Sequence, residues 1–370
     1  MSDTSATIQS GRLRDGIAAH TYAPSWVDRF TDFLDRSPGP VWVYYLLIWL
    51  IPITAAVLVK WIDGTYDAPF VNPLHIALAA GIGYIMADIA LLDYVARSAL
   101  AIFRPGSTLT EDEFEAFEYR LTTLPARPTL LWSVIPLVLV AVGMGSVVLF
   151  HLTIFDADVK RLALFTSSLS AVTDGLSLLA WPPLFGIWYY HTYHQLKVVD
   201  ELYIGYTKID PFYLKPLYAF ARLTAYTAIS LLIPTYFGPL TVPGYLGDPI
   251  FMADTVGLLI ISVFAIALFI WPLLGIHHLL IIEKEKLLVS SAKRIESAIA
   301  EFDRRIDAGE LQAMDKMKDT MDALVTKQAF IDKIPTWPWS TETSRLIASA
   351  VTLPFILYAV QRLLELIFRP

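Results

Sequence analysis

Residues 40–60 read PVWVYYLLIWLIPITAAVLVK, and the only charged side chain in this stretch is Lys60 at its end. A helix of about 20 apolar residues is long enough to cross the hydrocarbon core of a membrane. The whole chain has the same bias, because 55% of its 370 residues are hydrophobic and 17% are charged. Ordinary soluble domains carry about 25% charged residues. The composition therefore disfavours a soluble enzyme and predicts an all-α, multi-pass protein of the cell membrane.

Similar apolar windows recur along the chain and predict seven membrane-spanning helices. The predicted spans are residues 40–60, 74–103, 128–153, 171–193, 218–240, 254–283 and 343–367. In multi-pass proteins, Lys and Arg gather in the cytoplasmic loops. A cytoplasmic N-terminus places 23 of the 28 Lys and Arg residues on that side of the membrane. We therefore expect the N-terminus inside and the C-terminus outside.

The segments between the spans divide the chain into four parts. Residues 1–39 form a cytoplasmic segment, in which SWVDRFTDFLDR (25–36) has one apolar helical face. Such a helix either lies in the membrane interface or packs on the bundle. Residues 40–283 contain the first six spans with cytoplasmic extensions, 284–334 are expected to form a cytoplasmic helical hairpin, and 335–370 comprise a linker and the seventh span.

Residues 284–334 show a helical repeat with apolar spacings of four and three. The repeating residues are Leu288, Ala292, Ile295, Ile299, Phe302 and Ile306, then Met314, Met317, Met321, Leu324 and Ile331. This spacing is typical of a coiled-coil seam. Gly309 lies between the two stripes, which predicts an antiparallel pair of helices. The seam either closes within one chain or joins neighbouring subunits.

Several classes of function are disfavoured by residue counts. The chain has no cysteine, which excludes disulfides, thiolate metal sites and cysteine nucleophiles. Its formal net charge of −7 argues against a nucleic-acid partner. No catalytic motif is recognisable, so we expect neither an enzyme nor a bound cofactor.

Ionisable side chains within the predicted spans are costly to bury, so each one raises a functional hypothesis. Asp88 lies near the middle of the second span and either forms structural hydrogen bonds or binds an ion or ligand. Asp93 and Arg97 are four residues apart and are expected to pair on one helical face. Asp174 begins the fourth span and is expected to be solvated at the outer surface.

Histidine and aromatic residues supply two further candidate sites. The weak candidates for a metal or haem site are His191, His194, His277 and His278. The alternative is that these histidines are polar residues of the membrane interface. Residues that could line an apolar ligand pocket are Tyr84, Asp88, Trp132, Phe150, Trp181 and Trp271. Aromatic residues at helical spacing can equally form the core of the bundle.

The last span combines small, hydroxyl-bearing and charged residues. The candidate pore-lining residues are Ser349, Thr352, Ile356, Ala359, Gln361, Arg362 and Glu365. Such a polar face can surround a water-filled pore. It can also let neighbouring helices pack closely. Pro354 is expected to kink this helix near its centre.

The topology and the polar last helix resemble the seven-transmembrane ion-channel superfamily that includes insect odorant and gustatory receptors. Leu357-Tyr358 is followed here by Ala359-Val360 and Gln361, where the insect receptors carry Thr-Tyr, five apolar residues and Gln-Phe. The chain is also similar to prokaryotic membrane proteins that end in a segment like Pro-Thr-Trp-Pro-Trp (335–339) before one span. The resemblance implies a tetramer with the last helix around a pore, subunit contacts between cytoplasmic helices, and a ligand in the outer half of each bundle.

These observations favour a homo-oligomeric, ligand-gated type of cation channel whose partners are its own copies, the lipid bilayer and a small-molecule ligand. A transporter or flippase that uses Asp88 is the first alternative. A membrane enzyme or haem protein built on the histidines, and a non-catalytic signalling or scaffold protein, are the others.

Overall fold

The computed structural model describes residues 22–149, 164–236, 252–308 and 314–368. These residues form helices and contain no β-strand, which confirms the all-α prediction for the described part of the chain. Three of the helical stretches, Val41–Ile62, His75–Gly106 and Leu259–Asp307, are long and apolar enough to cross a membrane.

The described residues form α-helices and short 3₁₀ helices, the latter labelled η. In chain order they are α2 (Trp26–Arg36), α3 (Val41–Ile62), α4 (Pro73–Phe103), η1 (Arg104–Gly106), α5 (Glu111–Thr122), α6 (Ala126–Leu149), α8 (Ser168–Tyr206), η2 (Lys215–Tyr218), α9 (Ala219–Leu232), η3 (Ile233–Tyr236), α11 (Met252–Ile270), η6 (Trp271–Leu273), α12 (Leu274–Asp307), α13 (Met314–Asp332) and α14 (Thr341–Phe368). Each of the seven predicted spans overlaps one or more of these helices.

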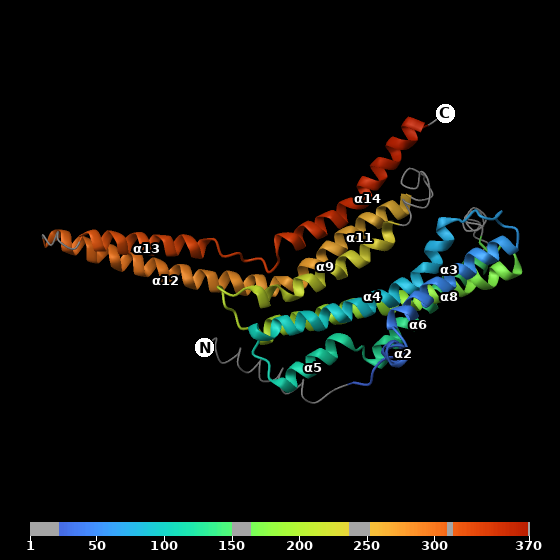
Figure 1. Ribbon diagram of the computed structural model, residues 1–370, viewed down its shortest axis with the longest axis horizontal. Coiled ribbons are helices and arrows are strands. Elements are labelled where there is room, and N and C mark those ends of the chain that lie inside the picture. Colours follow the sequence, from blue (N-terminus) through green and yellow to red (C-terminus); the bar gives the residue numbers. More distant parts are fainter. Residues whose placement is uncertain (1–21, 150–163, 237–251, 309–313, 369–370) are drawn as a thin grey trace.

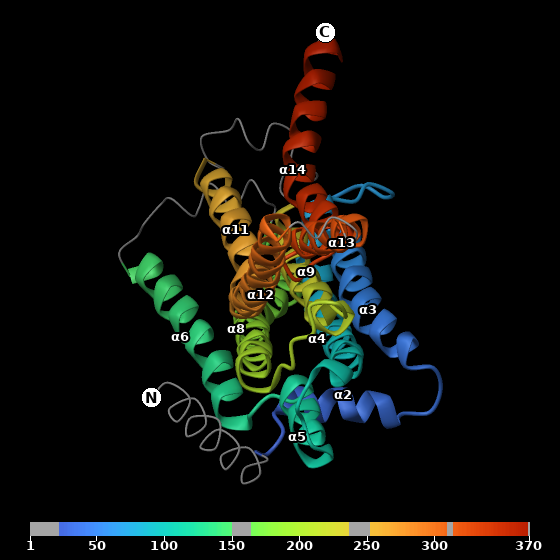
Figure 2. The ribbon, with the colours of Figure 1, turned by 90° about the vertical axis from the view of Figure 1, so that its left-hand side faces the viewer.

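The bundle is organised around the long pair α4 and α8, which pack against each other (Figure 1). Helices α3 and α9 pack on α4, and α6 packs on α8. Helices α11 and α14 pack on α9, so α6 and α14 stand at the periphery (Figure 2). The largest buried cluster lies where α4, α8 and α9 meet, and includes Phe103, Tyr203 and Phe220.

The short helix α2 is set by a local capping pattern. The side chain of Ser25 accepts a hydrogen bond from the backbone N–H of Asp28, and the Asp28 carboxylate accepts from the backbone N–H of Ser25. This reciprocal pair satisfies two of the otherwise unpaired amides at a helix start. Leu34 is buried against the bundle, whereas Phe33 is exposed. The apolar face predicted for residues 25–36 is therefore divided between a packed side and an exposed side.

Helices α12 and α13 lie side by side and project away from the bundle (Figure 1). The seam between them differs from the predicted stripe. Leu288, Ile295 and Phe302 are partly buried as expected, but Ala292, Ile299 and Ile306 are exposed. The second row on α12 consists instead of Ser291, which is buried, and Ala298, which is partly buried. Ser291 is polar, so an apolar pattern does not mark it.

A stack of aromatic rings joins the hairpin to the bundle. His277 of α12 stacks on Trp337 with ring centroids 3.7 Å apart, and Trp337 stacks on Trp339 at 4.4 Å. Trp339 in turn lies 5.1 Å from the ring of Phe269 in α11. The linker between α13 and α14 is therefore held against the junction of α11 and α12.

Candidate functional site

Helix α14 packs on the bundle by one face. Ile347 is buried, and Ala350 and Val351 pack against the main core cluster. Because a helix turns by about 100° per residue, Ser349 and Thr352 lie on a different side, and both are exposed. Ile356 and Ala359 continue this exposed side. We call Ser349, Thr352, Ile356 and Ala359 the outer face of α14.

The other predicted pore residues are Gln361, Arg362 and Glu365. They belong to α14, but their side chains lie outside the described residues. The same holds for Pro354, so the predicted kink stays a prediction.

An apolar cavity of about 210 Å³ lies between α3, α4, α8 and η3. Its lining residues are Trp49, Ala77, Leu78, Ala80, Gly81, Tyr84, Trp181 and Pro234. Two hydrogen bonds fix its walls: Trp181 Nε1 donates to the carbonyl oxygen of Leu78 at 3.0 Å, and the Tyr84 hydroxyl donates to that of Ser230 at 2.6 Å. Such a cavity suits a small apolar molecule.

Two of the six predicted pocket residues, Tyr84 and Trp181, meet in this cavity. Asp88 is buried on α4 but is not among the lining residues, and its Oδ2 atom accepts a hydrogen bond from Trp188 Nε1 at 2.7 Å. Trp132 stacks on Tyr190 at the α6–α8 contact. Trp271 is largely exposed in η6. Phe150 lies outside the described residues. Trp49 is a lining residue that sequence patterns did not single out.

The remaining polar residues of α4 and α8 also differ from expectation. Asp93 accepts hydrogen bonds from His191 and Gln195 of α8, and Arg97 is exposed. Asp174 is not solvated as predicted: its side chain is 7% exposed, and its Oδ2 atom lies 2.9 Å from Nζ of Lys60. The α3 end and the α8 start therefore share a buried ion pair.

Hydroxyl groups surround the Lys60–Asp174 ion pair. Lys60 also donates to Ser170, and the backbone N–H of Phe165 donates to Asp174 at 2.9 Å. Beside it, Asp63 accepts from Ser167 at 2.7 Å. Burial would raise the pKa of Asp63, but hydrogen bonds from Thr65, Ser167 and Thr166 outweigh it and hold the pKa below its usual value. The network joins α3 to the chain that leads into α8.

The four histidines do not converge on one site. His191 bonds to Asp93, and His194 Nε2 lies 3.0 Å from the backbone oxygen of Arg120. His277 stacks on Trp337, and His278 is exposed. No group of three or more His, Asp or Glu side chains among the described residues has the geometry to hold a metal ion.

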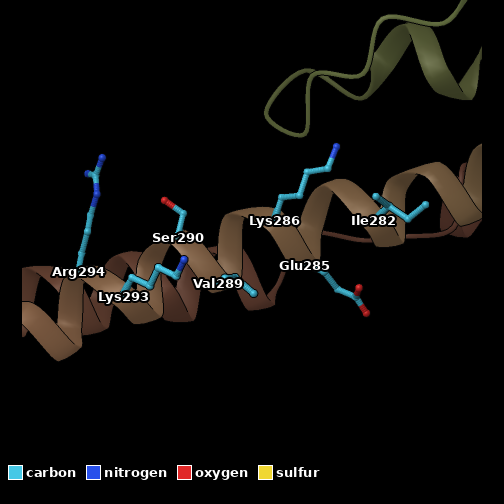
Figure 3. Close-up of a pocket in the computed structure, with 7 residues that line it drawn as sticks. All are labelled: Ile282, Glu285, Lys286, Val289, Ser290, Lys293 and Arg294. Atoms are coloured by element: carbon cyan, nitrogen blue, oxygen red, sulfur yellow. The ribbon is translucent and has the colours of Figure 1, made fainter. Parts of the chain in front are cut away.

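The outward side of α12 carries an open groove of about 690 Å³. Its lining residues are Ile282, Glu285, Lys286, Val289, Ser290, Lys293 and Arg294. Figure 3 shows Lys286, Ser290 and Arg294 pointing to one side of the helix and Glu285 to the other. This groove is open and lined by α12 alone, unlike the apolar cavity between α3, α4, α8 and η3.

Comparison with known proteins finds no family model, curated protein or solved structure that matches this chain.

Proposed function

We propose that the protein is a homo-oligomeric cation channel of the cell membrane, with seven spans, an inside N-terminus, and α14 lining the pore. The observation that carries the proposal is the outer face of α14. This helix stands at the edge of the bundle (Figure 2) and leaves Ser349 and Thr352 exposed. Hydroxyl groups on a membrane helix normally face other helices or water rather than lipid.

The chemistry of this face suits cations. The Thr352 hydroxyl donates its hydrogen to the backbone oxygen of Ala348 at 2.9 Å. A hydroxyl oxygen has two lone pairs that accept, so the oxygen of Thr352 presents them outward. A ring of such oxygens from several subunits would replace part of the hydration shell of a passing cation.

The hairpin offers a surface that supports subunit contact. Ile299 is 46% exposed and Ile306 is 45% exposed, and they follow Ala292 at intervals of seven residues. We call Ala292, Ile299 and Ile306 the outer row. An apolar row with heptad spacing is typical of a helix that packs against another helix, and α13 does not cover it.

The apolar cavity supports a ligand-gated type of channel. Trp49, Gly81 and Trp181 bring α3, α4 and α8 together around it, so a small apolar molecule bound there would change how these helices pack. The alternative, a transporter that uses Asp88, is less favoured, because Asp88 does not line the cavity and its carboxylate accepts a hydrogen bond from Trp188 within the bundle.

Single-cysteine scanning tests the pore proposal directly, since the chain has no native cysteine. With Thr352→Cys, a positively charged thiol reagent should abolish most of the current in planar bilayers. Matched controls are Leu346→Cys and Leu353→Cys, which are also exposed but lie about 100° or more from Thr352 around the helix. Current that is unaffected at Thr352→Cys, or equally blocked at all three, would refute the pore assignment.

The subunit contact makes a separate prediction. The double variant Ile299→Glu/Ile306→Glu places two charges in the outer row, and burying unpaired charges is unfavourable. We expect the oligomer to dissociate to the mass of one chain in detergent, measured by light scattering. The control Ser297→Glu/Ala300→Glu adds the same charges at other exposed positions of α12 and should leave the oligomer intact. If the wild-type protein itself is a monomer, the proposal is wrong.

A further inference from the structure

The contact between α4 and α8 contains a buried polar cluster that the proposed channel does not use. Asp93 lies on α4, and His191 and Gln195 lie one turn apart on α8. His191 Nε2 lies 2.9 Å from Oδ1 of Asp93, and Gln195 Nε2 lies 3.3 Å from the same oxygen. His191 is 2% exposed and Gln195 is 1% exposed, so these two side chains are sealed from bulk water.

Two polar atoms of this cluster have no hydrogen-bond partner among the described residues: Nδ1 of His191 and Oε1 of Gln195. The orientation of the Gln195 amide is set by Nε2, which also donates to the backbone oxygen of Leu121 at 3.0 Å. Oε1 is therefore an acceptor without a donor. Buried polar atoms that lack a protein partner are normally satisfied by internal water.

The charges near His191 are mainly negative. Asp93, Asp88 and Asp28 all act on its ring electrostatically. Other titratable groups in or beside the cluster are Tyr45 of α3, Arg97 of α4, Arg120 of α5, and His194 and the exposed Lys197 of α8. Arg120 is paired with Glu201, and Arg97 is exposed. The carboxylate charge is therefore not fully balanced by nearby cations, and a bound proton would balance part of it.

We propose that Asp93, His191 and Gln195 form a proton-binding site with internal water, in which the His191 imidazole exchanges one proton. The Asp93 carboxylate accepts from Nε2, so Nε2 carries a hydrogen in both states. The exchanged proton adds to the lone pair of Nδ1, comes from water, and returns to water. Uptake converts Nδ1 from an acceptor into a donor, so the α4–α8 contact acquires a charge that depends on pH.

Nitrogen NMR of the full-length protein in lipid nanodiscs, labelled with ¹⁵N-histidine, tests this site without reference to channel activity. We expect the His191 ring to change between the neutral and cationic forms across about pH 5–8, and to receive magnetisation from water. The His191→Gln variant identifies its signals by their loss. His278, which is exposed on the surface of the chain, is an internal reference for a ring that is not buried in the bundle.

Two variants separate proton binding from a purely structural role. Asp93→Asn retains an acceptor but removes the charge, so the ratio of cationic to neutral His191 at a given pH should fall about tenfold. Gln195→Leu removes the unpaired Oε1 and should reduce the transfer from water. If His191→Gln does not fold, the signal that moves in Asp93→Asn identifies the ring. A His191 ring in one protonation state throughout, or one without transfer from water, overturns the proposal.

Discussion

Replacing Gly186 with alanine will destabilise the protein by about 3 kcal/mol, the upper part of the usual range for overpacking. A Cβ atom at this position would lie 1.7 Å from the carbonyl oxygen of Trp132 and 2.8 Å from Cγ of Pro136. Neither a backbone oxygen nor a proline ring can rotate away. Helix α6 must therefore move until the first distance exceeds about 3.0 Å, and the α6–α8 contact opens.

Gly175→Ala is the matched control for this prediction. Gly175 lies on the same helix, and a Cβ atom there would have no neighbour within 4 Å. Alanine is favoured over glycine in helices by up to about 1 kcal/mol, so this variant should be as stable as the wild type or more so. Unfolding in denaturing detergent measures both. A spin-label distance between Leu139→Cys and Leu176→Cys, on the exposed sides of α6 and α8, reports the separation. Equal stability of the two alanine variants would contradict the packing argument.

Replacing Lys60 with methionine will cost a comparable amount, about 3–5 kcal/mol, because it leaves one charge of a buried ion pair without its partner. Lys60 is 1% exposed and Asp174 is 7% exposed, so water cannot reach the Asp174 carboxylate and compensate. Methionine has nearly the length of the lysine stem, which limits the loss of packing. The measurement is again the free energy of unfolding at neutral pH.

The double variant Lys60→Met/Asp174→Leu distinguishes the charge from the shape of this site. Buried ion pairs can often be replaced by apolar residues at little cost, so most of the stability lost in Lys60→Met should return. The hydroxyl groups of Thr166 and Ser170 can still bond to each other, since their oxygens lie 3.2 Å apart. A double variant as unstable as Lys60→Met would mean that packing, not charge, holds this end of α3.

Features that depend on neighbours along the chain were predictable from the sequence. The first span was expected at residues 40–60, and α3 runs from Val41 to Ile62, because the change from turn residues to an apolar run is local. The hairpin was expected to end at residue 334 and α13 ends at Asp332, while the seventh span was expected from residue 343 and α14 begins at Thr341. The seam between α12 and α13 was only half predictable, because Ser291 is buried there and hydrophobicity does not mark a serine.

The candidate site required contacts between distant parts of the chain. Lys60 and Asp174 were both expected near the outer surface, yet their pairing depends on two helix ends separated by 114 residues meeting in space. The signal available in the sequence was a lone lysine at the end of one apolar run and a lone aspartate at the start of another. The cavity could not be predicted for the same reason. Trp49 of α3 and Pro234 of η3 are far apart in the sequence, and they line one cavity together with residues of α4 and α8.

The stacked rings of Phe269, Trp339, Trp337 and His277 have a mechanical consequence. The hydrogen bond between His277 Nδ1 and the backbone oxygen of Thr336, 2.9 Å, ties the linker to α12. Lys284 adds a second tie by donating to the backbone oxygen of Asp332 at 2.6 Å. The hairpin is therefore attached to the bundle at the ring stack, and it projects from this point as a lever arm. A force applied at the distant tip of the hairpin would act on the first turn of α14 through this contact.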